Sequence, residues 1–170
     1  MIVNGDLILR QFRRDDREAL AKLADNVNVS KYLTDRFPSP YTLADSDCWI
    51  AKVGSEDVPH NFAIEWQDQF VGSIGLAPLG DVYHRTANIG YWLGEPYWGN
   101  GLATRAVAMI MDYIFANLQF IRIQAVVFAE NENSIRVLEK NNFTLEAVLR
   151  QHLTKNGRTQ DAMLYAKLRG

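Results

Sequence analysis

The sequence predicts a mixed α/β fold in which a central, mostly antiparallel sheet of seven strands is flanked by helices. The periodicity of apolar residues changes several times between the alternation of strands and the three-to-four spacing of helices. The strands between residues 61 and 93 follow one another through short connections, which is typical of an antiparallel meander, whereas a long helical segment separates them from the later strands. With 170 residues the chain fits one domain, residues 1–170.

The first half of the chain is expected to begin with one strand and two helices. Residues 7–12, with apolar side chains at alternate positions, form an edge strand, and residues 15–25 form a helix that begins with acidic residues. A second helix covers residues 43–53, with Thr42 as its N-cap and Asp45 at the capping-box spacing.

Three strands follow, and we expect them to pair as an antiparallel meander. Residues 61–66 and 70–79 flank a turn at Gln67–Gln69 and form a hairpin. Residues 86–93 form the third strand beside it.

The second half combines two helices with three strands. Residues 103–118 keep apolar side chains at helical spacing over four turns, and the β-rich run 120–129 follows. Residues 134–140 form a short helix that stops at Asn141–Asn142, because asparagine accepts the left-handed conformation at a helix end. The two final strands flank Asn156–Gly157, the strongest short hairpin-turn signal.

Charge, cysteine and histidine content exclude several function classes. The 18 Lys and Arg residues against 20 Asp and Glu residues give a net charge of -2, which provides no basic field for nucleic acid or a membrane surface. Cys48 stands alone, and His60, His84 and His152 lack the spacing of metal ligands. Residues 1–12 lack the apolar core of a signal peptide, and no stretch approaches the roughly 20 apolar residues of a spanning helix. We expect a cytoplasmic protein that binds no metal, nucleic acid or membrane.

The segment YWLGEPYWGNGLATRA, residues 91–106, passes from a strand through three glycines into the start of a helix. Gly94 and Gly99 have the outer spacing of a P-loop, but Asn100–Gly101 stands where that motif requires lysine and then serine or threonine. The segment also lacks the third glycine of a dinucleotide fingerprint. It shares with both motifs a glycine turn before a helix N-terminus, where free N–H groups and the helix dipole favour a phosphate. A plain helix-entry turn is the alternative interpretation.

Several blocks of the sequence resemble one enzyme family. Trp98-x-x-Gly101-x-Ala103 resembles the acyl-CoA pyrophosphate loop of the GCN5-related N-acetyltransferases (GNAT), usually Gln/Arg-x-x-Gly-x-Gly/Ala, with tryptophan in the first place. The blocks NIGYWLGEPYWGNGLATRA, ENENSIRVLEKNNF and VLRQHLTKNGRTQDAMLYAKL resemble successive parts of the RimJ/RimL-like branch, the ribosomal-protein alanine and serine N-acetyltransferases. The opening LILRQFRRDDREAL also fits, so the resemblance spans nearly the whole chain in order.

The resemblance implies the GNAT acyl-CoA N-acyltransferase fold, in which the fourth and fifth strands, residues 86–93 and 120–129, splay apart. Backbone groups of Tyr91 and Leu93 would then pair with the pantetheine arm of acetyl-CoA instead of a neighbouring strand. Asn131 matches the asparagine that bonds the same arm.

In the same family the glycine loop holds the CoA pyrophosphate. The resemblance assigns this role to main-chain N–H groups of residues 99–104, with Asn100 and Arg105 placed to assist, although a solvated helix charge is the alternative for Arg105. The full set implied in cofactor binding is Tyr91, Leu93, Trp98, Gly99, Asn100, Gly101, Leu102, Ala103, Thr104, Arg105, Asn131 and Ser134.

The catalytic base is the point at which this sequence departs from the family. The usual base position on the fourth strand holds Asn88, which cannot take a proton. Glu65, Glu95 and His84 are the alternative bases, directly or through water, and each has a surface group as its structural alternative.

The position of the general acid also differs from the family pattern. Many members of the family use a tyrosine in the helix after Asn131, and Leu138 takes that place here. Ser134 is the remaining hydroxyl able to bond the leaving thiolate, and an N-cap is its structural alternative. The predicted catalytic residues are therefore Ser134 and Glu65.

The sequence thus predicts acetyl-CoA-dependent acetylation of a primary amine by direct attack in a ternary complex, without a metal. The expected acceptor is the α-amine of a protein or peptide N-terminus, of the ribosomal-protein alanine or serine type. An amino acid, polyamine or aminoglycoside is the alternative within the enzyme class, and a non-catalytic acyl-CoA-binding module is the alternative outside it. The resemblance places the acceptor entrance at residues 35–40 and also implies a homodimer.

Overall fold

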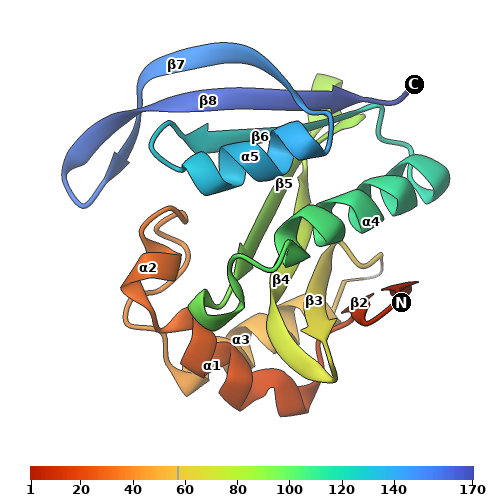
Figure 1. Cartoon of the computed structure of the whole chain (residues 1–170), viewed down its shortest axis with the longest axis vertical. Coiled ribbons are helices and arrows are strands. Elements are labelled where there is room, and N and C mark those ends of the chain that lie inside the picture. Colours follow the sequence, from red (N-terminus) through yellow and green to blue (C-terminus); the bar gives the residue numbers. More distant parts are fainter. Residues whose placement is uncertain (57) are drawn as a thin grey trace.

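The computed structural model describes residues 1–56 and 58–170. Its strands form an eight-stranded sheet in the order β1-β2-β3-β4-β5-β6-β8-β7, and helices cover both faces (Figure 1). Neighbouring strands are antiparallel except β5 and β6, which run parallel. The strands are β1 (Ile2–Asn4), β2 (Leu7–Arg10), β3 (Asn61–Trp66), β4 (Gln69–Pro78), β5 (Thr86–Leu93), β6 (Arg122–Phe128), β7 (Thr144–Lys155) and β8 (Arg158–Leu168). The predicted mixed α/β class is confirmed, but the sheet has eight strands instead of seven.

The additional strand comes from the amino-terminal residues. β1 pairs with β2 across a turn in which Gly5 has a φ of +63°, a left-handed conformation that glycine adopts without steric cost. The prediction of residues 7–12 as the edge strand is wrong, because β1 is the edge and β2 lies between β1 and β3. The Asn4–Gly5 pair is itself a hairpin signal.

The two helices predicted in the first half are confirmed as α1 and α3, and α2 between them was not predicted. α1 (Arg17–Ala24) is followed by a short helix, α2 (Val27–Ser30), and by α3 (Leu43–Gly54). At the start of α3 the Thr42 hydroxyl accepts from the Asp45 N–H, while the Asp45 carboxylate accepts from the Thr42 N–H. This is the predicted capping box.

The helices of the second half also match. α4 (Leu102–Asn117) follows β5, and α5 (Glu132–Lys140) follows β6. Asn142 has a φ of +59° just beyond α5, and Asn156 and Gly157 have φ of +51° and +75° in the β7–β8 turn, as the turn signals predict. In the described part of the chain, no helix combines the length and the apolar character needed to cross a membrane.

The two faces of the sheet carry different helices. α4 and α5 cover one face, where the larger core includes the fully buried Ile110 and Ile123. α1 and α3 cover the other face over a smaller core around Leu20. β5 serves both cores, since Leu93 packs in the first and Trp92 in the second. Its backbone therefore runs through the middle of the molecule.

β5 and β6 diverge after a short shared start. Their parallel pairing covers only Thr86–Asn88 against Arg122–Gln124, so residues 89–93 of β5 are paired on the β4 side alone. Beyond this start β6 continues with β8 as its neighbour. The space between residues 89–93 and 125–128, here called the wedge, opens where the two strands separate in Figure 1. The predicted splay of the fourth and fifth strands is confirmed.

Candidate functional site

The loop that enters α4 contains two left-handed glycines. Gly99 and Gly101 have φ of +78° and +72°, where any other residue would be strained. A Cβ atom built at either position would meet nothing within 4 Å. The loop therefore presents bare, uncrowded backbone at the N-terminus of a helix.

The backbone N–H groups of residues 99–104 lack a partner in the described part of the chain. Within residues 1–56 and 58–170 they donate to no backbone acceptor, and α4 has no side-chain cap. The next N–H group, that of Arg105, donates to the Gly101 carbonyl at 3.1 Å and so begins the regular helical pattern. Because the helix dipole adds positive potential at the same point, the loop suits an anionic group such as a phosphate.

Two side chains hold this loop together. The Trp98 indole donates from Nε1 to the Leu93 carbonyl at 2.8 Å. The Asn100 amide donates to the carbonyls of Tyr97 and Trp98 at 3.3 and 3.2 Å. Asn100 thus stabilises the loop, its contact with a phosphate stays a prediction, and the Leu93 carbonyl already has a partner within the chain.

Arg105 is also engaged by the protein. Its Nη2 donates to the Asn4 carbonyl and to Oδ1 of Asp6, both at 2.8 Å. The Trp66 indole donates to Oδ2 of Asp6 at 2.6 Å, and these hydrogen bonds from Arg105 and Trp66 lower the Asp6 pKa. Arg105 therefore fastens the β1–β2 turn to α4, and its role beside the pyrophosphate stays a prediction.

The β5 side of the wedge offers backbone groups. The Gly94 N–H donates to the Val71 carbonyl on β4 at 2.9 Å, so Gly94 faces β4. Since successive residues of a strand direct their backbone groups to opposite sides, Leu93 and Tyr91 direct theirs away from β4. These groups point into the wedge, as the resemblance implies.

Asn131 caps α5 at the other side of the wedge. Its Oδ1 accepts from the Ser134 N–H at 3.2 Å, which places Ser134 inside the first turn of the helix. The interpretation of Ser134 as the N-cap is therefore wrong. The Nδ2 group of Asn131 donates to no acceptor in the described residues, so it remains available to a ligand.

Ser134 contacts a side chain that sequence reasoning missed. Its Oγ lies 2.8 Å from the phenol oxygen of Tyr91, which also donates to the Ser134 carbonyl at 3.2 Å. Burial raises the pKa of Tyr91 to about 12, although the hydrogen bond with Ser134 lowers it. The two residues are 43 positions apart, so only strand alternation, which places Tyr91 on the face of α4 and α5, pointed toward this contact.

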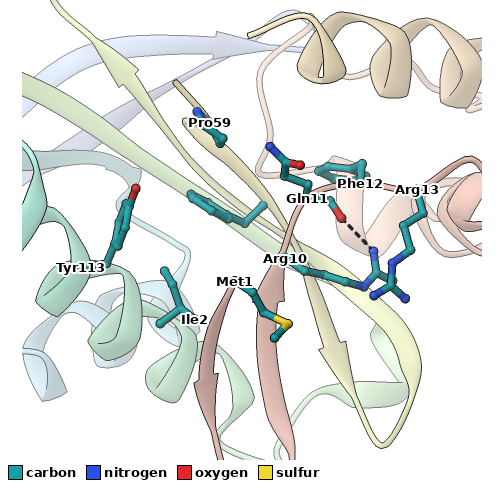
Figure 2. Close-up of a pocket in the computed structure, with 9 residues that line it drawn as sticks. Met1, Ile2, Arg10, Gln11, Phe12, Arg13, Pro59 and Tyr113 are labelled. Carbon is teal, nitrogen blue, oxygen red and sulfur yellow. Dashed lines mark hydrogen bonds between the residues drawn. The ribbon is translucent and has the colours of Figure 1, made fainter. Parts of the chain in front are cut away.

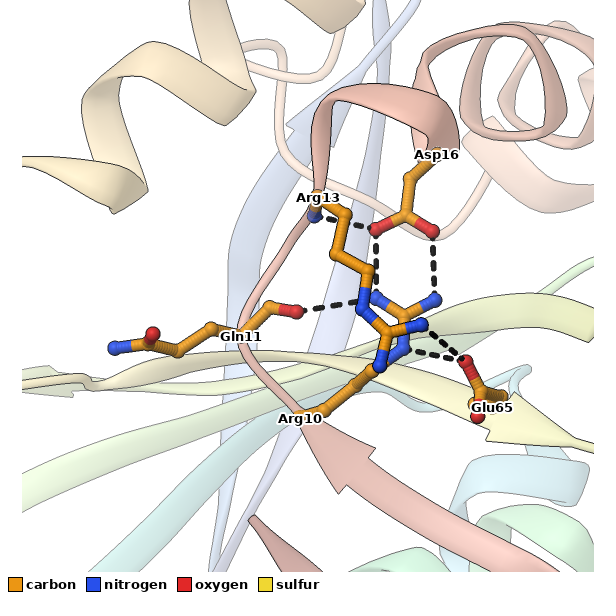
Figure 3. Close-up of polar contacts among 5 residues, drawn as sticks. All are labelled: Arg10, Gln11, Arg13, Asp16 and Glu65. Atoms are coloured by element: carbon orange, nitrogen blue, oxygen red, sulfur yellow. Dashed lines mark hydrogen bonds and ion pairs between the residues drawn. The ribbon is translucent and has the colours of Figure 1, made fainter. Parts of the chain in front are cut away.

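Glu65, a predicted catalytic residue, lies in a buried ion cluster (Figure 3). Its Oε2 accepts from Nε of Arg10 at 2.5 Å and from Arg13 at 3.5 Å. Arg10 also bonds both carboxylate oxygens of Asp16 at 2.7 Å. These contacts give Glu65 a structural role between β2 and β3, and its catalytic role stays a prediction.

The two other candidate bases have protein partners as well. Glu95 accepts from the side-chain amides of Asn26 and Asn28 at 2.7 and 2.9 Å. The His84 ring lies 3.0 Å from the Asp81 carbonyl on the exposed β4–β5 connection. Neither contact directs these side chains to the wedge.

Two positions depart from the family pattern as the sequence indicates. Leu138 is fully buried in the larger core and presents no polar group to the wedge. The Asn88 side-chain oxygen accepts from the Gln124 amide at 3.0 Å, where β5 and β6 begin to diverge. Neither side chain can exchange a proton with an amine or a thiol.

The expected acceptor loop, residues 35–40, packs beside the wedge. Phe37 contacts Trp92 of β5 with ring centroids 5.6 Å apart and planes at 73°. Lys155, near the β7–β8 turn, forms an ion pair with Asp35 at 2.7 Å. The loop is therefore held both to the β5 side of the wedge and to the hairpin beyond β6.

Two surface cavities lie elsewhere. One, of about 370 Å³, is lined by residues that include Met1, Arg10 and Tyr113 (Figure 2). The other, of about 410 Å³, includes Glu146 and Lys167. Neither lining contains a predicted site residue. Among the residues described, no His, Cys, Asp and Glu side chains group as metal ligands.

Comparison with known proteins agrees with this geometry. Residues 6–144 match the family model described as an acetyltransferase (GNAT) domain. The chain is 34% identical over 163 residues to "Uncharacterized N-acetyltransferase YoaA" of Bacillus subtilis (strain 168), an alignment that covers 94% of this chain and 92% of that protein.

Two solved structures are similar over almost the whole fold. Mycobacterium smegmatis RimJ in complex with CoA-disulfide has a TM-score of 0.82 and 28% identity, covering 95% of this chain and 81% of that chain. Spermidine N-acetyltransferase from Vibrio cholerae, in complex with CoA and spermine, has a TM-score of 0.82 and 25% identity, covering 98% and 97%. The family that the sequence blocks indicated is confirmed, and the chain belongs to the GNAT family of N-acetyltransferases.

Proposed function

We propose that this N-acetyltransferase moves the acetyl group of acetyl-CoA to the α-amine of a protein or peptide N-terminus, in a ternary complex. The observation that carries the proposal is the run of N–H groups at residues 99–104, on the N-terminus of α4, which have no acceptor among the residues that the structure describes. A CoA pyrophosphate brings the negative charge and the acceptor oxygens that these donors lack. The similar RimJ and spermidine N-acetyltransferase structures were both solved with CoA or a CoA derivative.

The wedge suits the remainder of the CoA molecule. The pantetheine arm contains two amides, and the wedge presents backbone groups of Tyr91 and the Leu93 N–H on one side. The free Nδ2 of Asn131 lies at the start of α5 on the other side. When bound, acetyl-CoA supplies the thioester, while these groups hold it and fix its orientation.

An α-amine suits this site, because the candidate proton acceptors of the site are bound to other side chains. At pH 7, removing a proton from an α-amino group costs about 1 kcal/mol, whereas a lysine costs about 4–5 kcal/mol. The carboxylates of Glu65 and Glu95 are both held by other side chains. An acceptor that loses its proton readily therefore suits this chain best.

A polyamine is the second candidate, favoured by the similarity to a spermidine N-acetyltransferase. A polyamine is multiply cationic and calls for unpaired carboxylates along its path. Beside the wedge, Asp35 is paired with Lys155 at 2.7 Å and Glu130 with Arg158 at 2.5 Å. This pairing supports the N-terminal acceptor over the polyamine.

The test is a comparison of acceptors. Thiol release from acetyl-CoA is followed with peptides that begin with alanine or serine, with the same peptides blocked at the N-terminus, and with spermidine. We expect turnover with the free peptides and none with the blocked ones. Equal turnover of free and blocked peptides, or a kcat/KM for spermidine well above that for every peptide, would overturn the proposal.

A paired substitution tests the loop. Gly101→Asp places a carboxylate where the phosphates would lie, so CoA affinity measured by titration calorimetry should fall at least a hundredfold. Gly157→Asp is the matched control, because Gly157 has a similar left-handed φ of +75° and open space around it, and lies in the β7–β8 turn. Equal affinities for the two folded variants would contradict the assignment of the loop.

A further inference from the structure

Tyr91 and Ser134 join the two sides of the wedge through their hydroxyl groups. Tyr91 belongs to β5 and Ser134 to the first turn of α5, and their oxygen atoms lie 2.8 Å apart. Both side chains are partly buried, and the pair lies between the predicted pantetheine contacts on β5 and the cap residue Asn131. The resemblance assigns Tyr91 only a backbone role, so this contact adds a function for its side chain.

Two arrangements of the protons satisfy this contact. Burial raises the pKa of Tyr91 to about 12, so the phenol carries one proton at neutral pH, and Ser134 offers it two acceptors, Oγ at 2.8 Å and the carbonyl at 3.2 Å. When the phenol donates to the carbonyl, the Ser134 hydroxyl can donate to the phenol oxygen. When the phenol donates to Oγ, the serine's own proton must point to a third position. An anion in the wedge favours this second arrangement, because the serine proton can then reach it.

We infer that Tyr91 is a positioning residue for acetyl transfer, in that its phenol orients the Ser134 hydroxyl so that the serine proton points into the wedge. This inference rests on the proposed function, because it needs the CoA sulfur in the wedge. As the amine nitrogen bonds to the acetyl carbon, the C–S bond breaks and its electron pair stays on sulfur. The Ser134 O–H donates a hydrogen bond to that thiolate, and the amine's proton leaves to water.

A purely structural clasp between β5 and α5 is the competing explanation, and the chain contains a matched control for it. Tyr165 on β8 also donates from its phenol to α5, to Oε1 of Glu139 at 3.0 Å. That contact lies near the end of α5 away from Ser134. Tyr165→Phe removes a sheet-to-helix hydrogen bond without touching the wedge.

The first measurement separates kcat from KM in Tyr91→Phe, Ser134→Ala, the double variant and Tyr165→Phe. We expect Tyr91→Phe to lower kcat about tenfold while KM for acetyl-CoA changes less than twofold, which corresponds to about 1.4 kcal/mol of transition-state stabilisation. The double variant should be no slower than Ser134→Ala, because both changes remove the same hydrogen bond. Tyr165→Phe should keep wild-type kcat.

The second measurement does not depend on turnover. The pKa of the thiol of bound CoA is read from thiolate absorbance, with the complex of desulfo-CoA as the blank for each variant. An oriented Ser134 donor stabilises the thiolate, so that pKa should rise by about one unit in Tyr91→Phe and Ser134→Ala and stay unchanged in Tyr165→Phe.

The outcomes separate this inference from the function on which it rests. If Tyr91→Phe matches Tyr165→Phe in both measurements, or if the kcat losses of the two single variants multiply in the double variant, the positioning role is rejected while the acetyltransferase proposal stands. Failure of the wild-type protein to bind CoA in calorimetry overturns both.

Discussion

The Nε atom of Arg10 lies 2.5 Å from Oε2 of Glu65, and the same guanidinium holds both oxygens of Asp16. Burial disfavours a charged guanidinium, but the hydrogen bonds that Arg10 donates to Asp16 and Glu65 outweigh it and raise the Arg10 pKa. The cluster ties the end of β2 to β3 and to the residues before α1. Glu65 therefore stabilises the fold next to the entry of the first helix.

Glu65→Gln tests this assignment. The change removes one charge of a buried pair, so we expect the free energy of unfolding to fall by roughly 2–4 kcal/mol, measured with urea. kcat should stay within threefold of wild type. Glu146→Gln is the control, since Glu146 forms the same kind of pair with Arg122 at 2.6 Å but is more exposed. A kcat loss above a hundredfold with unchanged stability would restore Glu65 as the base.

Arg105→Ala separates fold from cofactor binding. Because Arg105 bonds Asn4 and Asp6 at a partly exposed pair, its loss should lower the free energy of unfolding by about 1 kcal/mol or less. The CoA dissociation constant should change less than twofold in calorimetry. Arg17→Ala, which breaks a similarly exposed pair with Asp47, controls for loss of a surface cation. A tenfold weaker CoA affinity specific to Arg105→Ala would show that the guanidinium reaches the phosphates.

Asn131 has two functions that different substitutions separate. Asn131→Asp keeps an oxygen for the Ser134 N–H, so stability should stay near wild type, whereas Asn131→Ala should cost about 1 kcal/mol. Both changes remove the Nδ2 donor, and we expect CoA affinity to fall about tenfold in each. Thr42→Ala removes the cap of α3 and should reduce stability alone. Wild-type affinity in Asn131→Asp would refute a ligand contact for this amide.

Tyr91 makes stability sensitive to alkaline pH. Burial raises its pKa from 10.0 to about 12, so the unfolded chain releases this proton first as pH rises. The stabilisation is complete below pH 10 and is lost between pH 10 and about 12. Between pH 8 and 11, wild type should lose roughly 1 kcal/mol more unfolding free energy than Tyr91→Phe. Tyr83→Phe, at an exposed position, should match wild type, and parallel loss in all three proteins would exclude the effect.

Local signals account for most of the fold that the sequence predicts. The Asn156–Gly157 turn, the Thr42–Asp45 capping box and the apolar stripe of residues 103–118 each depend on neighbours in the chain. The eighth strand was missed although its signal, Asn4–Gly5, is of the same local kind. β1 has three residues, and a strand this short cannot be told apart from the next strand when only the alternation of apolar and polar side chains is considered.

The partners of charged and polar side chains were beyond the reach of sequence. Arg10 and Glu65 are 55 positions apart, and Arg105 and Asp6 are 99 apart, so no periodicity connects them. The donors of the glycine loop could be anticipated from the sequence. They are backbone N–H groups, and their direction follows from the local turn and not from side-chain identity. This is why the N–H groups of residues 99–104 could be anticipated from the sequence, whereas the protein partners of Asn100 and Arg105 could not.

Strand β8 follows β7 in the chain but lies between β6 and β7 in the sheet. During synthesis β6 therefore emerges well before its antiparallel neighbour β8. The β6 side of the wedge lacks this neighbour until residues 158–168 have left the ribosome. Deleting those residues would remove β8, which pairs with both β6 and β7. Deleting residues 2–4 would remove only the edge strand β1. Truncations and fusion partners are accordingly better tolerated at the β1 end, and a C-terminal tag needs a linker that begins beyond Leu168.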